Sequence, residues 1–263
     1  APIGISDDGR YLSFTSATPL DVAPAGASTE DRLYSLDRDA DGNGVFDESA
    51  YGSTRIRLQS VGTNGVALTG RVAATGMSAN GRFLTFTSTS QESGALDGAS
   101  GAIPAGNVWL RDRDVDGNGT FDEVGGTSTN VVSVSASGVY ASEAYSRAAS
   151  CSAATITWAG ATGAAYVNRN LWSGASVSND GTVAFASTDP LGVAGFSTTA
   201  PGVFVASRAS GVAPVSVATD GSTGCGDDPK IAADAPVVAY TSRASSLVAN
   251  DANGTEDAFV SSY

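Results

Sequence analysis

Short runs in which apolar and polar residues alternate recur along the whole chain. The segment Tyr11-Leu-Ser-Phe-Thr-Ser16 is one example, and similar runs are bounded by Gly, Asp and Asn throughout. Such alternation is typical of half-buried β-strands, and Gly, Asp and Asn favour the turns between them. Long apolar stripes with a 3.6-residue period are missing, so the pattern predicts an all-β protein without large amphipathic helices.

One of these patterns repeats along the chain. Ser6-Asp-Asp-Gly-Arg-Tyr-Leu-Ser-Phe-Thr-Ser16 matches Ser78-Ala-Asn-Gly-Arg-Phe-Leu-Thr-Phe-Thr-Ser88 almost position for position, and further copies start at Ser178, more weakly at Ala232, and in degenerate form at Thr155. Asp-Gly and Asn-Gly are strong signals for a tight hairpin turn. Each copy therefore predicts strand, turn, strand. An aromatic residue takes the same core position on each second strand: Phe14, Phe86, Trp158, Phe185 and Tyr240.

A third strand follows in every copy, and a fourth in three of them. Third strands are predicted at 32–36, 107–110, 165–167, 202–205 and 257–260, and fourth strands at 55–60, 131–134 and 214–217. Four-stranded antiparallel units repeated around an axis form a β-propeller. We predict one propeller domain over 1–263 with about five to six blades, in units 3–62, 73–136, 144–172, 173–218 and 229–263. Unit 144–172 is short and degenerate, and the last unit lacks its fourth strand. We therefore expect a processed chain, or a neighbouring chain that completes the last blade.

The repeat resembles a known family. The pattern Ser-x-Asp-Gly-Arg-Tyr-Leu-x-Phe-x-Ser, followed by Asp-x-x-Val/Leu-aromatic, is similar to the TolB-type propeller repeat, with good matches in the first, second and fourth units. The resemblance implies a propeller fold. It also implies a place among exported proteins, since TolB-type propellers include periplasmic scaffolds of the cell envelope. It is weak for function, because propellers serve many roles.

Two acidic segments carry the clearest chemical motif, at 37–48 and 112–123. Each has the form Asp-Arg-Asp-x-Asp-Gly-Asn-Gly-x-Phe-Asp-Glu and matches a calcium loop of the form Asp-x-Asp-x-Asp-Gly…Glu over twelve positions. In this register positions one, three and five are aspartates, Gly42 or Gly117 makes the turn, position seven offers its backbone carbonyl and position twelve is a glutamate. The predicted ligands are Asp37, Asp39, Asp41, Asn43 and Glu48, then Asp112, Asp114, Asp116, Asn118 and Glu123, with Asp47 and Asp122 as alternative or outer ligands.

These loops depart from an EF-hand in two respects. Position eight is Gly44 or Gly119 where an aliphatic residue is usual, and the preceding segment is a predicted strand. We therefore expect two calcium ions in loops inserted between a third and a fourth strand, where they would stiffen the loops. The alternative is a pair of solvated acidic turns without metal. The two segments hold ten of the chain's 27 acidic residues, and crowded carboxylates repel one another unless a cation lies between them.

Composition excludes several classes of function. The 263 residues carry a net charge of −13, which disfavours nucleic acid as a partner, and no apolar stretch is long enough to insert into a membrane. There is no His, so Ser-His and Cys-His catalysis and His-ligated zinc are excluded. Cys151 and Cys225 are the only cysteines. We expect them to form one disulfide bridge in an exported protein, the alternative being two buried free thiols.

These observations lead to one main hypothesis and one rival. The main hypothesis is a non-catalytic, calcium-stabilised propeller in the periplasm, on the cell surface or outside the cell. It would bind a protein partner, or associate with itself, through its surface or the unfinished last blade. The rival is a carbohydrate-active hydrolase or lyase, or a glycan-binding module, that uses the propeller funnel. Catalysis would need two carboxylates close together, and the acids outside the loops, such as Asp180, Asp227 and Asp228, occur in turn-like sequences.

Overall fold

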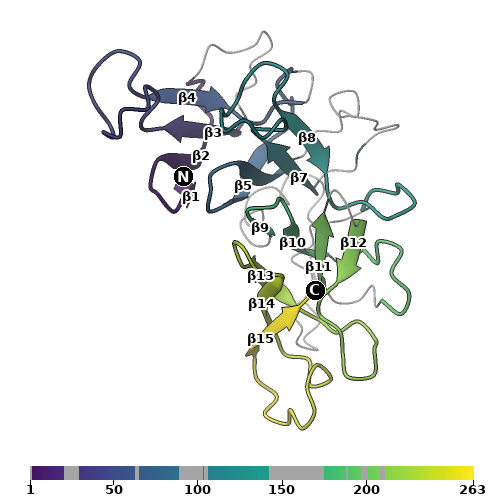
Figure 1. The fold of residues 1–263 in the computed structure, drawn as a ribbon. Helices are drawn as coiled ribbons and strands as arrows, with labels where there is room; N and C mark the ends of the chain where they lie inside the picture. Colours follow the sequence, from purple (N-terminus) through teal and green to yellow (C-terminus); the bar gives the residue numbers. More distant parts are fainter. Residues whose placement is uncertain are drawn as a thin grey trace.

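Four antiparallel sheets make up the computed structural model, which describes residues 2–20, 30–62, 65–88, 103, 106–141, 175–187, 189–196, 201–207 and 211–263. In each sheet the strands are paired in chain order (Figure 1). The first sheet contains β1 (Pro2–Ile5), β2 (Tyr11–Ser16), β3 (Arg32–Asp37) and β4 (Arg55–Leu58). The second contains β5 (Val72–Met77), β6 (Phe83–Ser88), β7 (Asn107–Asp112) and β8 (Ser128–Val131). The third contains β9 (Ala175–Val177), β10 (Val183–Ser187), β11 (Gly202–Ser207) and β12 (Gly211–Pro214), and the fourth β13 (Asp227–Ile231), β14 (Val237–Ser242) and β15 (Asp257–Ser262).

The serine that opens each repeat holds the turn between the first two strands. In the first sheet the Ser6 hydroxyl accepts a hydrogen bond from the Tyr11 amide at 2.9 Å and donates one to Asp8 Oδ1 at 2.6 Å. Ser78 makes the same two contacts, with the Phe83 amide at 2.9 Å and Asn80 Oδ1 at 2.6 Å. The repeated Ser-x-Asp/Asn-Gly sequence therefore folds into the same turn each time.

A stacked aromatic pair joins the second and third strands of every sheet. The predicted aromatic residue of the second strand lies opposite an aromatic residue of the third strand, and the two rings stack. The pairs are Phe14–Tyr34, Phe86–Trp109, Phe185–Phe204 and Tyr240–Phe259, with ring centroids 5.7–5.9 Å apart. Trp158 lies outside the described residues. Stacked cross-strand aromatics stabilise a sheet beyond the area they bury, which explains why the position recurs.

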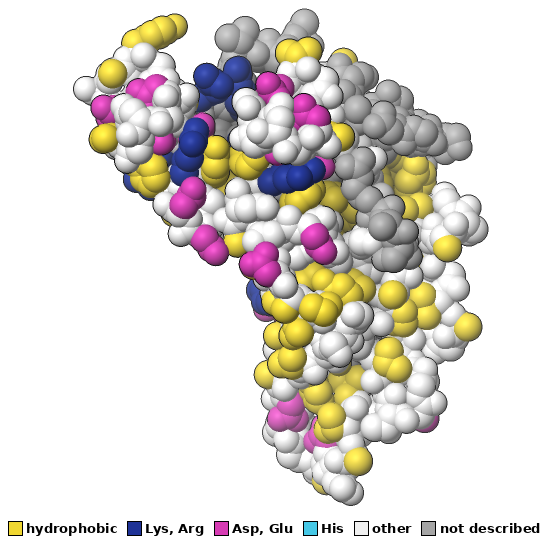
Figure 2. All heavy atoms as spheres, viewed as in Figure 1, with side chains coloured by type: hydrophobic (Ala, Val, Ile, Leu, Met, Phe, Trp, Pro, Cys, Tyr) yellow, Lys and Arg dark blue, Asp and Glu magenta, His cyan; other side chains and the backbone are white. Residues whose placement is uncertain are grey.

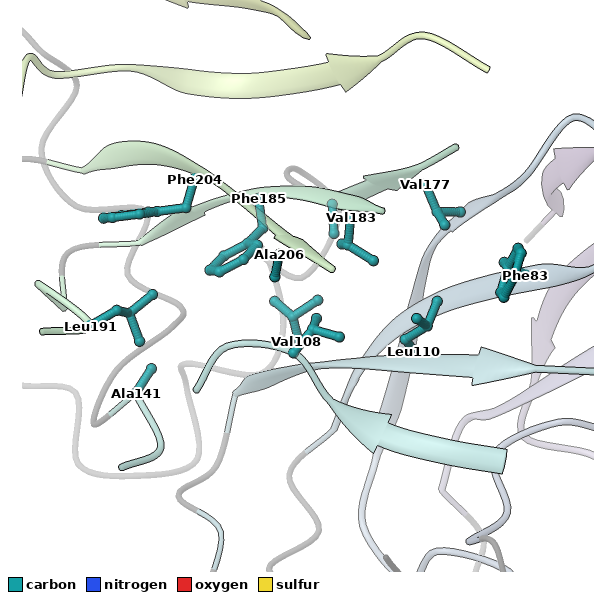
Figure 3. Close-up of a cluster of buried hydrophobic side chains, with 12 residues drawn as sticks. Phe83, Val108, Leu110, Ala141, Val177, Val183, Phe185, Leu191, Phe204 and Ala206 are labelled. Carbon is teal, nitrogen blue, oxygen red and sulfur yellow. The ribbon is translucent and has the colours of Figure 1, made fainter. Parts of the chain in front are cut away.

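Consecutive sheets pack through the first strand of the later one. β5 contacts the first sheet, β9 contacts β5 and β6, and β13 contacts β9, β10 and β11. The buried cluster in Figure 3 lies at the second of these contacts, where Phe83, Val108 and Leu110 meet Val177, Val183 and Phe185. The sheets of the predicted units 73–136 and 173–218 are thus direct neighbours. Unit 144–172 lies outside the described residues.

Hydrogen bonds between equivalent turns also link the sheets. The Asp7 amide donates to the Ala79 carbonyl at 2.8 Å, and the Asn179 amide donates to the Ala233 carbonyl at 2.8 Å. Between these two links, the Asn80 amide donates to Asn179 Oδ1 at 2.8 Å. The four hairpin turns therefore follow one another along one side of the stack of sheets.

Two predicted fourth strands were wrong in position. The sequence predicted strands at 131–134 and 214–217, whereas β8 (Ser128–Val131) and β12 (Gly211–Pro214) begin three residues earlier and end where the predicted strands start. A buried serine ends the ladder in each case. The Val108 amide donates to the hydroxyl of Ser133, and the Val203 amide donates to the hydroxyl of Ser216, both at 2.9 Å. Because the hydroxyl accepts this bond, the chain leaves the sheet here.

The all-β prediction is confirmed, whereas the closed propeller arrangement stays a prediction. All elements found in the described residues are strands, and the fourth sheet has three strands where the others have four. No helix among the described residues has the length and apolar character needed to cross a membrane.

Candidate metal-binding loops

The two acidic segments connect the third strand to the fourth in the first and second sheets, as predicted. Each turns sharply at two glycines with positive φ, Gly42 (+71°) and Gly44 (+83°) in the first loop, and at Asp47, which has a φ of +58°. The second loop repeats these angles at Gly117, Gly119 and Asp122. Glycine adopts this left-handed conformation without strain, and Asp is one of the few other residues that tolerate it. The shared Gly-Asn-Gly sequence and the following Asp therefore explain why both loops take the same path.

The first carboxylate of each loop pairs with an arginine of the repeat turn. Arg10 donates two hydrogen bonds to Asp37, at 2.8 and 3.0 Å. Arg82 binds Asp112 in the same manner, at 2.8 and 2.9 Å. The hydrogen bond to Asp37 raises the pKa of Arg10 above its usual value. Asp37 and Asp112 therefore anchor the loops to the sheets.

The penultimate acidic residue of each loop also has an arginine partner. Arg38 donates to both oxygens of Asp47 at 3.0 Å, and this hydrogen bond lowers the pKa of Asp47. In the second loop Arg113 binds Asp122 with bonds of 2.7–3.2 Å. The second pair is the more buried, since the Arg113 side chain is 2% exposed and that of Arg38 is 25% exposed.

The second aspartate of each loop holds the backbone turn. Asp39 accepts hydrogen bonds from the amides of Asn43 and Gly44, at 2.9 and 3.1 Å. Asp114 accepts the equivalent bonds in the second loop, at 3.0 and 3.1 Å. Burial raises the pKa of Asp114, but hydrogen bonds from the backbone amides of Gly119 and Asn118 contribute to a net shift that is downward. The charged form of this carboxylate is therefore favoured.

The exposed half of each loop gathers around an asparagine side chain. The Asn43 amide donates to Asp41 Oδ2 at 3.1 Å and to Glu48 Oε2 at 2.7 Å. The second loop matches it residue for residue, with Asn118 donating to Asp116 at 2.9 Å and to Glu123 at 2.6 Å. The sequence prediction gave each asparagine only a backbone carbonyl role. The structure instead places its side chain between two carboxylates.

These contacts divide the twelve predicted ligands into two groups. The carboxylates of Asp37, Asp47, Asp112 and Asp122 are held by arginines, whereas Asp39, Asp41, Asn43, Glu48 and their counterparts gather in each loop. Within the described residues no three or more His, Cys, Asp or Glu side chains are arranged to hold a metal ion. Two calcium sites therefore stay a prediction.

A buried polar network beneath the second loop was not predicted from the sequence. Gln59 is fully buried and donates to Ser35 Oγ at 2.7 Å and to Asp122 Oδ1 at 2.9 Å. Its carbonyl oxygen accepts a bond from Arg111, which also donates to Thr129 at 3.0 Å. Burial lowers the pKa of Arg111 to about 10. The network joins the first sheet to the second loop.

Beside this network lies a cavity of about 210 Å³. Strands β3 and β4 form one wall, and residues 119–122 of the second loop form the other. Four of the chain's 14 basic residues line it: Arg10, Arg55, Arg57 and Arg113. In Figure 2 most of the visible Lys and Arg side chains lie at the end of the molecule that holds these two sheets, close to acidic side chains.

The other predicted site residues have simpler surroundings. Asp180 accepts bonds from Ser178 and the Thr182 amide, and Asp228 pairs with Lys230 at 3.0 Å. Asp227 accepts a bond from the Asp228 amide at 2.8 Å. Thus all three acids weighed for catalysis take part in local contacts. Cys225 is half-buried, whereas Cys151 lies outside the described residues, so the disulfide bridge stays a prediction.

Comparison of the chain with protein-family models gives no match, and comparison with curated protein sequences gives none either. The TolB-type resemblance therefore rests on the repeat residues alone.

Proposed function

We propose that the chain is a non-catalytic, calcium-stabilised repeat module of propeller type that presents a rigid surface to a protein partner or to further copies of itself. The observation that carries the proposal is the agreement between the two acidic loops. They share their glycine angles, their arginine pairs, their aspartate-held turns and their asparagine contacts. A loop conformation repeated in such detail supports a shared ligand better than two unrelated acidic turns do.

Calcium is the ligand that suits these side chains. It is bound by six to eight oxygens from carboxylates, amide and backbone carbonyls and water. Asp41 and Glu48 lie within 2.7–3.1 Å of one amide nitrogen of Asn43. A cation between them would relieve the repulsion of two neighbouring carboxylates, and rotation of the amide would offer an oxygen in place of the NH₂ group. Asp116, Asn118 and Glu123 offer the same set.

The arginine pairs favour a ligand register that starts two residues later than the sequence motif implies. Counting from Asp39, the first, third and fifth positions are Asp39, Asp41 and Asn43, and the sixth is Gly44, with a φ of +83°. That order agrees with the first six positions of a calcium loop, in which glycine holds the sixth position, whereas Glu48 then stands at the tenth position and not at the twelfth. Asp37 then has no ligand role, which is consistent with its pair to Arg10. We propose Asp114, Asp116 and Asn118 as the equivalent ligands.

An exported location suits such sites. Calcium loops outside cells work with dissociation constants of about 10⁻⁴–10⁻³ M, because calcium is abundant there. The net charge of −13 makes cation binding favourable and keeps the chain soluble. We therefore propose a periplasmic, cell-surface or extracellular setting, in which the ions stiffen two long connections that bury little apolar surface.

The fourth sheet offers a place for assembly. β15 is an edge strand of this three-stranded sheet, and Val260 on it is 71% exposed. Edge strands present backbone donors and acceptors to another strand. We propose that a strand of a partner or of a second copy pairs with β15. Light scattering after size-exclusion chromatography tests self-association. Val260→Lys would abolish a dimer or polymer formed in this way, and a concentration-independent monomer points to a separate protein partner.

Catalysis is the alternative function that we do not favour. Asp180, Asp227 and Asp228 each take part in local turn or ion-pair contacts, which supports a structural role. Turnover on a panel of oligosaccharides, lost on substituting one of these acids, would replace our proposal.

Isothermal titration with calcium tests the calcium part of the proposal. The test variant Asp41→Asn with Asp116→Asn removes one carboxylate from each loop. The matched control, Asp251→Asn with Glu256→Gln, removes the same charge from the fourth unit. We expect the test variant to bind calcium about tenfold more weakly or worse, since each carboxylate contributes to the charge of its site. Equal binding by both variants would overturn the calcium assignment.

A further inference from the structure

The cavity between the first sheet and the second acidic loop carries an excess of positive charge in a strongly acidic protein. Its lining includes four arginines and two aspartates. Arg10 is engaged by Asp37 and Arg113 by Asp122. Arg55 and Arg57 are exposed, and neither has an ion-pair partner among the residues that the structure describes. The cavity thus contains two guanidinium groups whose charges are not neutralised.

Strand geometry directs these two groups to one face. Arg55 and Arg57 are two residues apart on β4, so their side chains project from the same side of the sheet. Opposite them on β3 are Asp37 and Ser35, which also line the cavity. The arrangement therefore aims two guanidinium groups at one space.

The repeat does not require arginines at these positions. In the second sheet, Ser128 stands opposite Asp112 and Asn130 opposite Leu110, so these two residues take the places of Arg55 and Arg57. The fold forms the same four-stranded ladder with small polar residues. The arginine pair is a feature of the first sheet alone, and it faces a cavity that lies between the first two sheets.

Rigid neighbours hold the rest of the cavity in place. Arg113 is 2% exposed, and its guanidinium lies 5.0 Å from the centroid of the Tyr11 ring and 4.9 Å from that of Phe121. These two rings are in turn 5.0 Å apart. Arg113 also donates to the Gly81 carbonyl at 2.8 Å. A site whose walls are fixed before binding loses little entropy when a ligand enters.

We propose that this cavity binds a small oxyanion with at least two negative charges, held by Arg55 and Arg57. A guanidinium group donates paired hydrogen bonds that match the oxygens of phosphate, sulfate or carboxylate. About 210 Å³ is roughly seven times the volume of one water molecule in the liquid. The space therefore holds an oxyanion with several waters, or an oxyanion carried on a small organic group.

Isothermal titration with inorganic phosphate at low ionic strength tests the proposal. It is run once in metal-free buffer and once with calcium kept below the level at which calcium phosphate precipitates, because residues 119–122 of the second acidic loop line the cavity. The test variant is Arg55→Ser with Arg57→Asn, which installs the residues of the second sheet. The control is Lys230→Ser with Arg243→Ser, which removes the same charge from exposed ion pairs in the fourth unit. We expect saturable binding by the wild type and the control, and binding at least about tenfold weaker in the test variant. Circular dichroism verifies that each variant is folded, and Arg57→Gln alone gives a milder version of the same comparison.

Two results would overturn the proposal. One is the absence of saturable phosphate binding by the wild type, and the other is equal weakening in the test and control variants, which would indicate a general charge effect. Glucose 6-phosphate and glucose identify the source of the oxyanion. Tighter binding of the sugar phosphate than of phosphate, with none of glucose, assigns a phosphorylated organic ligand. Equal binding of both phosphates assigns the free ion.

Discussion

Gln59 and Asp122 are 63 positions apart in sequence, and the Gln59 amide donates a hydrogen bond to Asp122 Oδ1 at 2.9 Å. The bond joins the end of the first sheet to the acidic loop of the second. Asp122 is also the carboxylate that Arg113 holds. One carboxylate thus links a loop, a buried arginine and a neighbouring sheet.

Replacing this glutamine should destabilise the fold. Gln59→Leu keeps the size of the side chain but removes its bonds to Ser35 and Asp122. We expect a loss of about 2–4 kcal/mol in the free energy of unfolding, measured by urea denaturation, because one lost partner is charged and the site is buried. A double-mutant cycle with Asp122→Ala isolates the pair, because alanine has no acceptor for the Gln59 amide. A coupling energy near zero would show that the contact contributes nothing to stability.

The free energy that the serine of the repeat turn contributes to folding should depend on pH in the first unit but not in the second. Burial raises the pKa of Asp8, but hydrogen bonds from Ser6 and the Arg10 amide outweigh it, so the net pKa lies below 3.8. A carboxyl with a lowered folded-state pKa stabilises the fold above its unfolded pKa. That stabilisation is lost as the pH falls through the folded value. Ser6→Ala should therefore cost about 1–2 kcal/mol well above pH 3.8 and less at a pH well below it.

Ser78→Ala is the matched control for this prediction. Ser78 has the same contacts, but its partner is Asn80, which does not titrate. The loss of unfolding free energy caused by Ser78→Ala should therefore be the same well above and well below pH 3.8. If the two serine variants lost the same free energy at every pH, the ionised Asp8 would have no part in the turn.

Two equivalent glycines should respond differently to alanine. Gly81 and Gly9 share a φ of +75°, so alanine at either position costs about 1 kcal/mol for the left-handed conformation. A Cβ at Gly81 would lie 2.6 Å from Tyr11 Cδ2, whereas at Gly9 the nearest atoms are 3.8 Å away. Gly81→Ala should therefore lose about 1–3 kcal/mol more than Gly9→Ala. Equal melting temperatures for the two variants would contradict the close packing of adjacent turns.

Local sequence predicted much of the fold, because the signals that it uses are local. The Ser-x-Asp-Gly turn and the strands around Phe14 and Phe86 depend on residues within one hairpin, and the structure contains both. The alternation predicted half-buried strands, however, and β6 is buried along its whole length because neighbouring sheets cover it. The ends of the fourth strands were missed because Ser133 and Ser216 accept bonds from strands 25 and 13 residues away. The pattern of apolar residues carries no sign of that contact.

The candidate sites show the same limit. The acidic motifs could be recognised in the sequence. The partner of Asp37, however, is Arg10, 27 residues earlier. The sequence does not reveal this ion pair, which leaves Asp37 outside the proposed set of calcium ligands. The cavity depends on β4 of the first sheet facing residues 119–122 of the second loop. Arg55 and Arg57 become candidate ligand-binding residues only because the packing of the two sheets places them at this cavity, and a single sequence does not specify that packing.

Native mass spectrometry of the wild type and two single-loop variants tests the central claim most directly. The variants are Asp41→Asn and Asp116→Asn, each measured in millimolar calcium and after treatment with a chelator. The account predicts one ion per loop, so two ions on the wild type and one on each variant, all removed by the chelator. A wild-type chain that carries no calcium, or variants that keep both ions, would contradict it.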